Sequence, residues 1–383
     1  MLKAYRTEIH PTPDQSQQIV RTFGVCRYLY NLYIATNQAR YQQGLPFLSA
    51  YDFDQWINRE YALEYPWIKA VSSKARKKAI VNAATAYRRF FKGLGGHPRF
   101  KKKHQQSASF YAPKNNAGDW TIERHRIKIP TLGWVRLKEF GYLPVGSRVT
   151  GGTITQQADR FFVSVTVKAG PPAMAEPPSG EGIGVDVGIK EFATTSQGDV
   201  FPNINQTAKI QKLERRLRLA QRAGSRKFEE RKRQGLPVHG GKNLAKNRLR
   251  IQKLSWRLAN QRRAYRETVI QALVKTKPRF ITVEHLNIRG MLKNRHLSKA
   301  IQDQGFYAFK QRLVQAANQH GIEIREVGMF YPSSKRCSRC GSKKLDLTLK
   351  DRIYDCPQCG LSIDRDLNAA NNLAQAKEYK ILH

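Results

Sequence analysis

Two pairs of cysteines constrain the fold of this chain more than any other feature of its sequence. Cys337 and Cys340 form one CxxC pair, and after fifteen further residues Cys356 and Cys359 form a second. Each CxxC turn presents two thiolates from one tight knuckle, so two knuckles complete a tetrahedron around a zinc ion. Because four cysteines leave no coordination position open, we expect one structural Zn²⁺ rather than an ion that activates water. Two redox-active dithiols and an iron centre are the alternatives.

Charge is the dominant feature of the composition. The 383 residues include 68 Lys and Arg against 29 Asp and Glu, which gives a net charge of +39 at pH 7. A compact body with that charge repels itself unless a polyanion is its usual partner. No apolar stretch of roughly 20 residues is present to span a bilayer, and the first residues contain no apolar signal core. We therefore expect a nucleic acid as partner, no membrane, and a reducing cytoplasm in which Cys26 is a buried core thiol.

The length of the chain predicts two or more compact domains, and a proline-rich segment marks a boundary. Four prolines and three glycines lie within AGPPAMAEPPSGEG at 169–182, which favours an extended connector, with the linker proper at 171–181. Before it, a first strand at 2–10, expected at a sheet edge, is followed by a helical block and then by further strands. If the first strand pairs with the later ones, the helices are an insertion. One expected helix starts near 14, and two more cover 52–62 and 72–92. The later strands are expected at 119–129, 133–139, 149–157 and 160–168.

After the linker, GIGVDVGIKEFATTSQGDVF predicts two strands joined by a turn. A pair of long basic helices is expected over 208–267, where 20 Lys or Arg stand against four acids. That imbalance is too one-sided for salt bridging along a solvated helix face, so nucleic-acid contact is favoured. The elements expected beyond them are a strand at 279–284, a helix at 298–319, a strand at 322–327, the cysteine module and a last helix from about 366.

Basic residues of three segments are the candidates for nucleic-acid contact. They lie on the polar face of the helix near 72–92, in the cluster at 99–103, and along the basic helix pair. The candidates are Lys74, Lys77, Lys78, Arg99, Lys101, Lys102, Lys103, Arg215, Arg218, Arg222, Arg250 and Arg257.

Three acids stand where a charge is costly unless it is paired or binds metal. Asp186 lies inside the apolar strand IGVDVG, Glu284 ends the strand FITVE, and Asp366 lies in SIDRDLNAANN at a helix start. Two strand carboxylates and one from a helix suit two Mg²⁺ ions, which activate a water and stabilise the leaving oxygen of a phosphodiester. Mn²⁺ is an alternative to Mg²⁺, and Asp364 is an alternative third ligand.

Each acid also has a purely structural interpretation. Asp186 would cap a turn before Gly188, Glu284 would pair with Arg289, and Asp366 would cap the last helix. His285, next to Glu284, points to the opposite face if the strand continues, and we assign it no catalytic role. The three acids together in so basic a chain favour a metal-dependent nuclease.

The motifs that carry these acids and cysteines resemble those of a known family. GIGVDVGIKEFAT, FITVEHLNIRGM, YPSSKRCSRCG and CGLSIDRDLNAANN are similar to the three RuvC motifs and the zinc ribbon of the TnpB family. FGVCRYLYNLYIATNQARY and GHPRFKKKHQQSASF resemble its amino-terminal signatures, so the likeness covers nearly the whole chain. At 285 a histidine stands where the family often has another acid.

The resemblance implies an α/β multidomain protein. Its parts are a wedge-like β-barrel at 1–10 and 106–170, a helical recognition lobe at 11–105, a RuvC-like nuclease domain of RNase H type at 182–334 and 362–383, and an inserted zinc ribbon at 335–361. By position, Asp186, Glu284 and Asp366 match the catalytic acids, and the four paired cysteines match the zinc ligands.

The resemblance also implies an RNA-guided DNA endonuclease of a transposable element. A guide RNA from the transposon end pairs with one strand of double-stranded DNA, and the protein reads a short motif beside the target. The active particle is then expected to be a monomeric ribonucleoprotein in the prokaryotic cytoplasm, associated with the nucleoid when bound to DNA. A nuclease-inactive RNA-guided repressor, a transposase that needs no RNA, and a zinc-ribbon transcription factor are the rival hypotheses.

Overall fold

The computed structural model describes residues 2–103, 108–114, 116–168, 170, 177–238, 240–348 and 351–383. The chain divides into two compact units, Met1–Pro171 and Pro172–His383. The division falls at the start of the segment expected as a linker, 171–181, of which 171–176 lie outside the described residues. No helix in the described ranges is both long and apolar enough to cross a bilayer.

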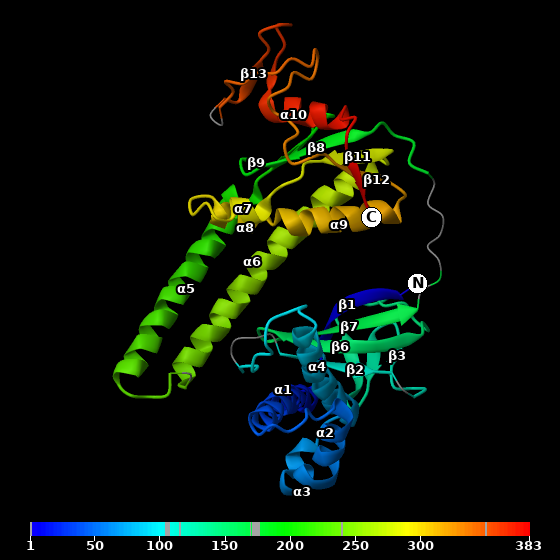
Figure 1. Ribbon diagram of the computed structural model, residues 1–383, viewed down its shortest axis with the longest axis vertical. Coiled ribbons are helices and arrows are strands. Elements are labelled where there is room, and N and C mark those ends of the chain that lie inside the picture. Colours follow the sequence, from blue (N-terminus) through cyan, green and yellow to red (C-terminus); the bar gives the residue numbers. More distant parts are fainter. Residues whose placement is uncertain are drawn as a thin grey trace. The chain divides into compact units, whose positions relative to one another are not determined.

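A seven-stranded antiparallel sheet forms the framework of the first unit (Figure 1). Its strand order is β2-β6-β7-β1-β5-β4-β3. The strands are β1 (Leu2–His10), β2 (Ser109–Pro113), β3 (Thr121–Ile122), β4 (Arg126–Ile129), β5 (Gly133–Leu137), β6 (Val149–Gln157) and β7 (Arg160–Lys168).

Strand β1 lies in the middle of this sheet, so the expectation of an edge strand is wrong. It pairs with β7 from Leu2 to Ile9 and with β5 at Ile9 and His10. Both partners lie more than 120 residues away, which is why no local pattern could show that each side of the strand is covered. The pairing does confirm that the first strand joins the later ones and that the helices between them are an insertion.

The expected strand at 119–129 is instead two short strands. β3 and β4 form an antiparallel hairpin in which Thr121 faces Lys128. Among the described strands β2 and β3 end the order of the sheet, with no pairing between them, so a closed barrel is not observed.

Helices α1 and α4 carry most of the insertion. Thr12 caps α1 (Pro13–Gln42) through a capping box, and Ser72 caps α4 (Ser73–Phe91). Between them lie α2 (Ala50–Trp56), a π-turn (Ile57–Tyr61), α3 (Ala62–Glu64) and a 3₁₀ turn (Pro66–Ile68), so the helix expected at 52–62 stays α-helical only to Trp56. Cys26 of α1 is 6% exposed, and burial raises the pKa of its thiol to about 12. The expected core thiol is confirmed.

A six-stranded mixed sheet forms the framework of the second unit (Figure 1), in the order β10-β9-β8-β11-β12-β15. Strands β8, β11 and β12 are parallel, whereas β9, β10 and β15 run antiparallel to their neighbours. The strands are β8 (Ile183–Val187), β9 (Glu191–Thr195), β10 (Val200–Pro202), β11 (Phe280–Val283), β12 (Glu323–Glu326) and β15 (Lys380–Leu382).

Two sets of helices pack against this sheet. Ile183 and Val185 of β8 join a core with α6 (Lys242–Lys275) and α9 (Phe306–Gln319). Gly184, between them, lies under α10 (Arg365–Ala374), and a Cβ at this position would be 2.0 Å from the Ala370 carbonyl oxygen. Because side chains alternate along a strand, β8 presents Asp186 to the same face as Gly184, the face that α10 covers.

The helix pair expected over 208–267 is α5 (Ala208–Arg233) and α6, which follow a 3₁₀ turn (Ile204–Gln206) and form a long hairpin that projects from the sheet (Figure 1). α7 (Ile288–Met291) follows β11. The single helix expected at 298–319 is two, α8 (Ser298–Gln304) and α9, because Gly305 between them has a left-handed φ of 66°. β13 (Ile353–Asp355) and β14 (Ser362–Asp364) form a hairpin in the cysteine module.

Candidate functional site

The four paired cysteines meet in one cluster. Their sulfur atoms all lie within 4.8 Å of one another, with Cys337 Sγ to Cys359 Sγ and Cys340 Sγ to Cys356 Sγ both at 3.6 Å. A tetrahedral zinc with Zn–S bonds of about 2.3 Å needs sulfur atoms about 3.8 Å apart. Spacing and donor chemistry both fit one zinc ion.

The knuckles are built as their sequence predicts. The Gly341 amide donates to the Cys337 carbonyl, and the Gly360 amide donates to the Cys356 carbonyl, with both glycines at a left-handed φ. Backbone amides of Cys359 and Gln358 lower the pKa of Cys356 to about 6, whereas burial and the neighbouring cysteines raise the pKa of Cys359 to about 12. Sulfur atoms crowded in this way cannot all be thiolates unless a cation lies between them. Tyr354 and Leu347 bury the cluster on its inner side.

The sheet register brings Asp186 and Glu284 together. Strand β11 pairs in parallel with β8, and Val283 lies opposite Val185. Asp186 and Glu284 are the next residues along these two strands, and neighbouring strands are about 4.8 Å apart. Ile281 and Val283 face the α9 side of the sheet, so Glu284 faces the α10 side together with Asp186.

Helix α10 carries Asp366, the third acid, whereas Asp364 lies at the start of this helix and has a different role. Asp364 is the N-cap of α10, because its Oδ1 accepts from the Asp366 amide at 2.9 Å and from the Leu367 amide at 3.1 Å. The capping role considered for Asp366 therefore belongs to Asp364. Asp366 lies in the first turn of a helix that packs on β8 and is half-buried, whereas Asp364 is exposed.

The three acids form one electrostatic cluster. Burial raises the pKa of Asp186 well above its ordinary range, and the charges of Glu284 and Asp366 raise it further. Burial also raises the pKa of Glu284, against a hydrogen bond from Ser333 that lowers it. The charge of Arg365 lowers the pKa of both groups but does not offset burial, and a bound cation would supply further positive charge.

The spacing of the acids differs from that of the cysteines. Among the described residues only the cysteines bring three or more ligand atoms within 4.8 Å of one another. The three carboxylates are therefore spread more widely than ligands of a single ion.

His285 lies on the opposite face from Glu284, as the alternation predicts. Its Nδ1 is 3.2 Å from Glu326, which also binds Lys310 of α9 at 2.5 Å and Lys380 of β15 at 2.9 Å. No local sequence pattern indicates this cluster, because its four members come from four separate segments.

Buried polar residues near the acids were also missed from sequence. Ser333 donates to Glu284, and Asn368 and Asn372 of α10 are 0% and 2% exposed. The four-residue spacing of the two asparagines places both on one helix face, which is a signal that the sequence did contain.

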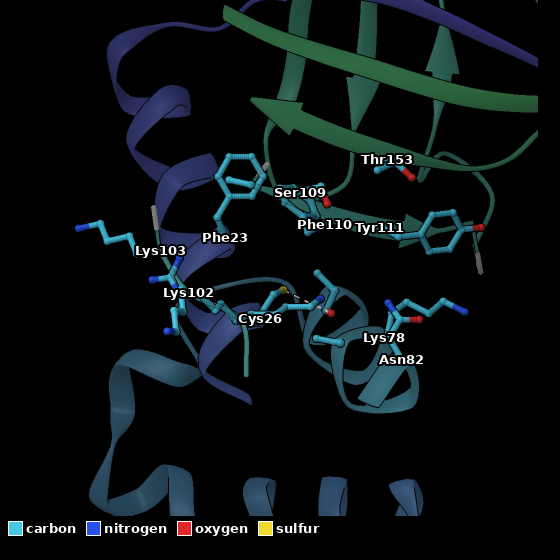
Figure 2. Close-up of a pocket in the computed structure, with 15 residues that line it drawn as sticks. Phe23, Cys26, Lys78, Asn82, Lys102, Lys103, Ser109, Phe110, Tyr111 and Thr153 are labelled. Atoms are coloured by element: carbon cyan, nitrogen blue, oxygen red, sulfur yellow. Dashed lines mark hydrogen bonds between the residues drawn. The ribbon is translucent and has the colours of Figure 1, made fainter. Parts of the chain in front are cut away.

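Four basic candidates of the first unit, Lys78, Lys101, Lys102 and Lys103, line a cavity of about 260 Å³ between α1, α4 and β2 (Figure 2), whereas Lys74, Lys77 and Arg99 do not. Phe23, Phe110 and Tyr111 form apolar walls, and Lys78 and Asn82 project from α4 beside Tyr111. The other basic residues of its lining are Arg27, Lys101, Lys102 and Lys103.

Three of the predicted basic residues already have partners inside the fold, one of them Lys78, whose ammonium lies 5.6 Å from the centre of the Tyr111 ring. Lys74 forms an ion pair with Asp119, and the Lys101 ammonium lies 4.1 Å from the centre of the Tyr30 ring, where burial lowers its pKa. Lys77, Arg99, Lys102 and Lys103 are exposed.

The basic candidates on the helical hairpin are all exposed. Apolar residues such as Leu213 and Leu254 hold α5 and α6 together, and the charged side chains cover the outside of the pair. The exposed candidates there are Arg215, Arg218, Arg222, Arg250 and Arg257.

Models of three known families match this chain. They are a helix-turn-helix domain at residues 1–45, a family described as "Probable transposase" at 162–295, and the Cas12f1-like TNB domain at 306–373. Residues 1–45 fold as β1 and one long helix, so the name of the first model does not describe their structure. The third covers the cysteine module and α10.

One curated relative matches nearly the whole chain and another about a third of it. The Escherichia coli K12 protein named "Putative RNA-guided DNA endonuclease InsQ" is 27% identical over 98% of this chain and 92% of its own length. The TnpB-like protein L79 of Acanthamoeba polyphaga mimivirus is 33% identical over 32% of this chain and 24% of its own. By these matches the chain is similar to a TnpB-like protein and to a protein named as an RNA-guided DNA endonuclease.

The fold of this chain is shared with a solved structure. A chain of the cryo-EM structure of the Cas12f1-sgRNA-target DNA complex matches with a TM-score of 0.57 at 12% identity, covering 99% of both chains. At that identity the match shows a common fold, and the Cas12f1-like TNB domain rests on the family model at 306–373.

Proposed function

We propose that this chain is an RNA-guided, metal-dependent DNA endonuclease of a transposable element that cuts through one RuvC-like site. One observation carries the catalytic part of the proposal. Asp186, Glu284 and Asp366 come from three distant segments and lie on one face of the sheet, where burial raises the pKa of Asp186 and the charges of Glu284 and Asp366 raise it further. Carboxylates at neighbouring ends of two central strands support the RNase H-like assignment of this domain.

The three carboxylates would hold two Mg²⁺ ions, or Mn²⁺ in their place. Hard oxygen ligands suit these ions, and the excess negative charge at Asp186 favours their binding. Bound there, the ions would supply an activated water and stabilise the leaving oxygen of a phosphodiester. The protein's own part is to fix the acids: the β8–β11 register sets Asp186 beside Glu284, and the docking of α10 sets Asp366.

The proposed partners are a guide RNA from the transposon end and double-stranded target DNA. A relative is named as an RNA-guided DNA endonuclease, and the structural neighbour was solved with an sgRNA and target DNA. The net charge of +39 supplies the affinity for backbones that such a complex needs. We assign backbone contact to the α5–α6 hairpin and to the basic cavity of the first unit.

We also propose a domain architecture and an assembly state for the particle. The first unit would be a wedge domain with a helical recognition lobe. The protein would read a short transposon-adjacent motif in the DNA beside the target. The particle would be a monomeric ribonucleoprotein in the cytoplasm. The zinc would stabilise structure.

A DNA transposase that needs no RNA is the second candidate, favoured by the description of the family model at 162–295. Purification separates the two. An RNA-guided nuclease brings one discrete RNA species with it when expressed beside its transposon end, whereas a transposase does not.

Cleavage of a plasmid library with randomised flanks tests the main proposal. The protein co-expressed with its neighbouring transposon-end RNA is expected to cut only plasmids that carry one short motif beside the guide match. Asp186→Ala is expected to abolish cutting and to leave RNA binding intact, because its carboxylate is needed only for the metal site. Continued cutting by Asp186→Ala would remove the active-site assignment.

A further inference from the structure

Two buried asparagines of α10 hold the chain segment that leads into the first zinc knuckle. The Asn372 side-chain amide donates to the Ser333 carbonyl at 2.7 Å and to the Arg336 carbonyl at 2.6 Å. The Asn368 side-chain amide donates to the same Arg336 carbonyl at 2.7 Å. A buried amide is costly unless it is hydrogen-bonded, so these contacts fix the segment against the helix.

The same asparagines set the position of a zinc ligand. Cys337 lies between Arg336, whose carbonyl accepts from both asparagines, and Ser338, whose amide donates to Asn368 Oδ1 at 3.0 Å. The backbone on both sides of this ligand is therefore held by the helix that carries Asp366.

Ser333 connects this segment to the second strand acid. It is 4% exposed, and its hydroxyl donates to a carboxylate oxygen of Glu284 while its carbonyl is held by Asn372. The Tyr331 hydroxyl donates to the Asn372 backbone carbonyl at 2.8 Å and fixes the start of the segment. A continuous set of contacts thus runs from Glu284 through Ser333 and Asn372 to the backbone at Cys337.

We propose that Ser333, Asn368 and Asn372 are positioning residues that make the carboxylate site depend on the zinc ribbon. This inference rests on the proposed nuclease function. Residues that hydrogen-bond a ligating carboxylate typically change metal affinity or activity 10- to 100-fold when they are removed. If α10 only packed against this segment, the Ser333 hydroxyl would not need to donate to Glu284. A change in metal affinity when that hydroxyl is removed therefore distinguishes positioning of the carboxylate from packing alone.

The test uses the complete RNA-bound particle and measures Mn²⁺ affinity by calorimetry as well as the Mg²⁺ dependence of cleavage. The Asp186→Ala particle serves as the baseline for ions that bind to the RNA. Ser333→Ala is expected to weaken the Asp186-dependent Mn²⁺ binding about tenfold and to raise the half-saturating Mg²⁺ concentration by a similar factor. RNA binding and zinc content are expected to stay unchanged in Ser333→Ala, because no zinc ligand is altered.

Asn372→Ala is expected to do more than Ser333→Ala. It should weaken Mn²⁺ binding and also speed zinc loss to a chelator, because the backbone before Cys337 loses a donor. Asn371→Ala, the neighbouring position on the same helix, is the matched control and is expected to match the wild type in both measurements.

The outcomes separate this inference from the proposed function. If the wild type does not cut, or if Asp186→Ala cuts, the proposed function fails. If those two behave as expected but Ser333→Ala binds Mn²⁺ as tightly as Asn371→Ala, this inference alone is wrong. Ser333→Ala removes only one oxygen atom, so the test stands even if Asn372→Ala does not fold.

Discussion

Glu326 shows how a single buried carboxylate can organise the end of a sheet. Its side chain is 1% exposed, and it receives Lys310 from α9, Lys380 from β15 and His285 from the segment after β11. Burial alone would raise the pKa of Glu326, but the hydrogen bonds from these three residues outweigh it and lower the pKa from 4.5 to about 2.

The lowered pKa predicts a pH-dependent contribution to stability. The stabilisation is fully present above about pH 4.5 and is lost as the pH falls toward 2, because protonation then breaks the cluster. Glu326→Gln is expected to lower the free energy of unfolding at pH 7 by roughly 3 kcal/mol, with a smaller difference from the wild type near pH 3. Denaturant unfolding at both pH values measures this, and an equal difference at the two would contradict the assignment.

At the scale of elements, the contact between α10 and β8 determines whether Asp366 reaches the strand acids. Gly184 permits this contact. A Cβ there would be 2.0 Å from the Ala370 carbonyl oxygen and 2.5 Å from the Ala374 amide nitrogen, so the helix backbone itself would have to move.

Gly184→Ala should therefore displace α10 and separate Asp366 from Asp186. We expect a loss of about 1–3 kcal/mol in the free energy of unfolding, as for other overpacked positions, and a larger loss of cleavage than of RNA binding. Gly328→Ala is the control, because a Cβ at Gly328 meets nothing within 4 Å. Wild-type cleavage by Gly184→Ala would show that the position of Asp366 is unimportant for the chemistry.

At the scale of the whole molecule, basic residues outnumber acidic ones, and many of them lie on exposed surfaces. The α5–α6 hairpin presents exposed arginines along both helices, while two acids near its base, Glu214 and Asp303, are held in ion pairs with Arg262. Such a surface holds nucleic-acid backbones without reading sequence.

Neutralising the exposed hairpin arginines should weaken RNA binding for all sequences and reduce its dependence on salt. For each phosphate that the protein no longer neutralises, the slope of log affinity against log salt concentration is expected to fall by roughly 0.7 to 0.9. Arg233→Gln is the control, because Arg233 is paired with Glu230 at 2.6 Å. Binding titrations across a salt series measure the slopes, and an unchanged slope in a variant that lacks Arg215, Arg218, Arg222, Arg250 and Arg257 would rule out the hairpin as a contact surface.

The sequence by itself determined the features that depend on local spacing and composition. The two CxxC pairs predicted a tetrahedral sulfur site, apolar alternation predicted β6 and β7 with their observed bounds, and the buried Cys26 followed from its apolar neighbours. These succeed because the knuckle, the strand period and the helix period are all set within about fifteen residues.

Only the tertiary structure decided what depends on contacts between distant segments. The position of β1 inside its sheet, the packing of α10 on β8, and the links from Ser333 and Asn372 all arise from partners far along the chain. A local pattern specifies which face a side chain occupies. Strand register and helix docking specify which other residues share that face, and a carboxylate site exists only once those are fixed.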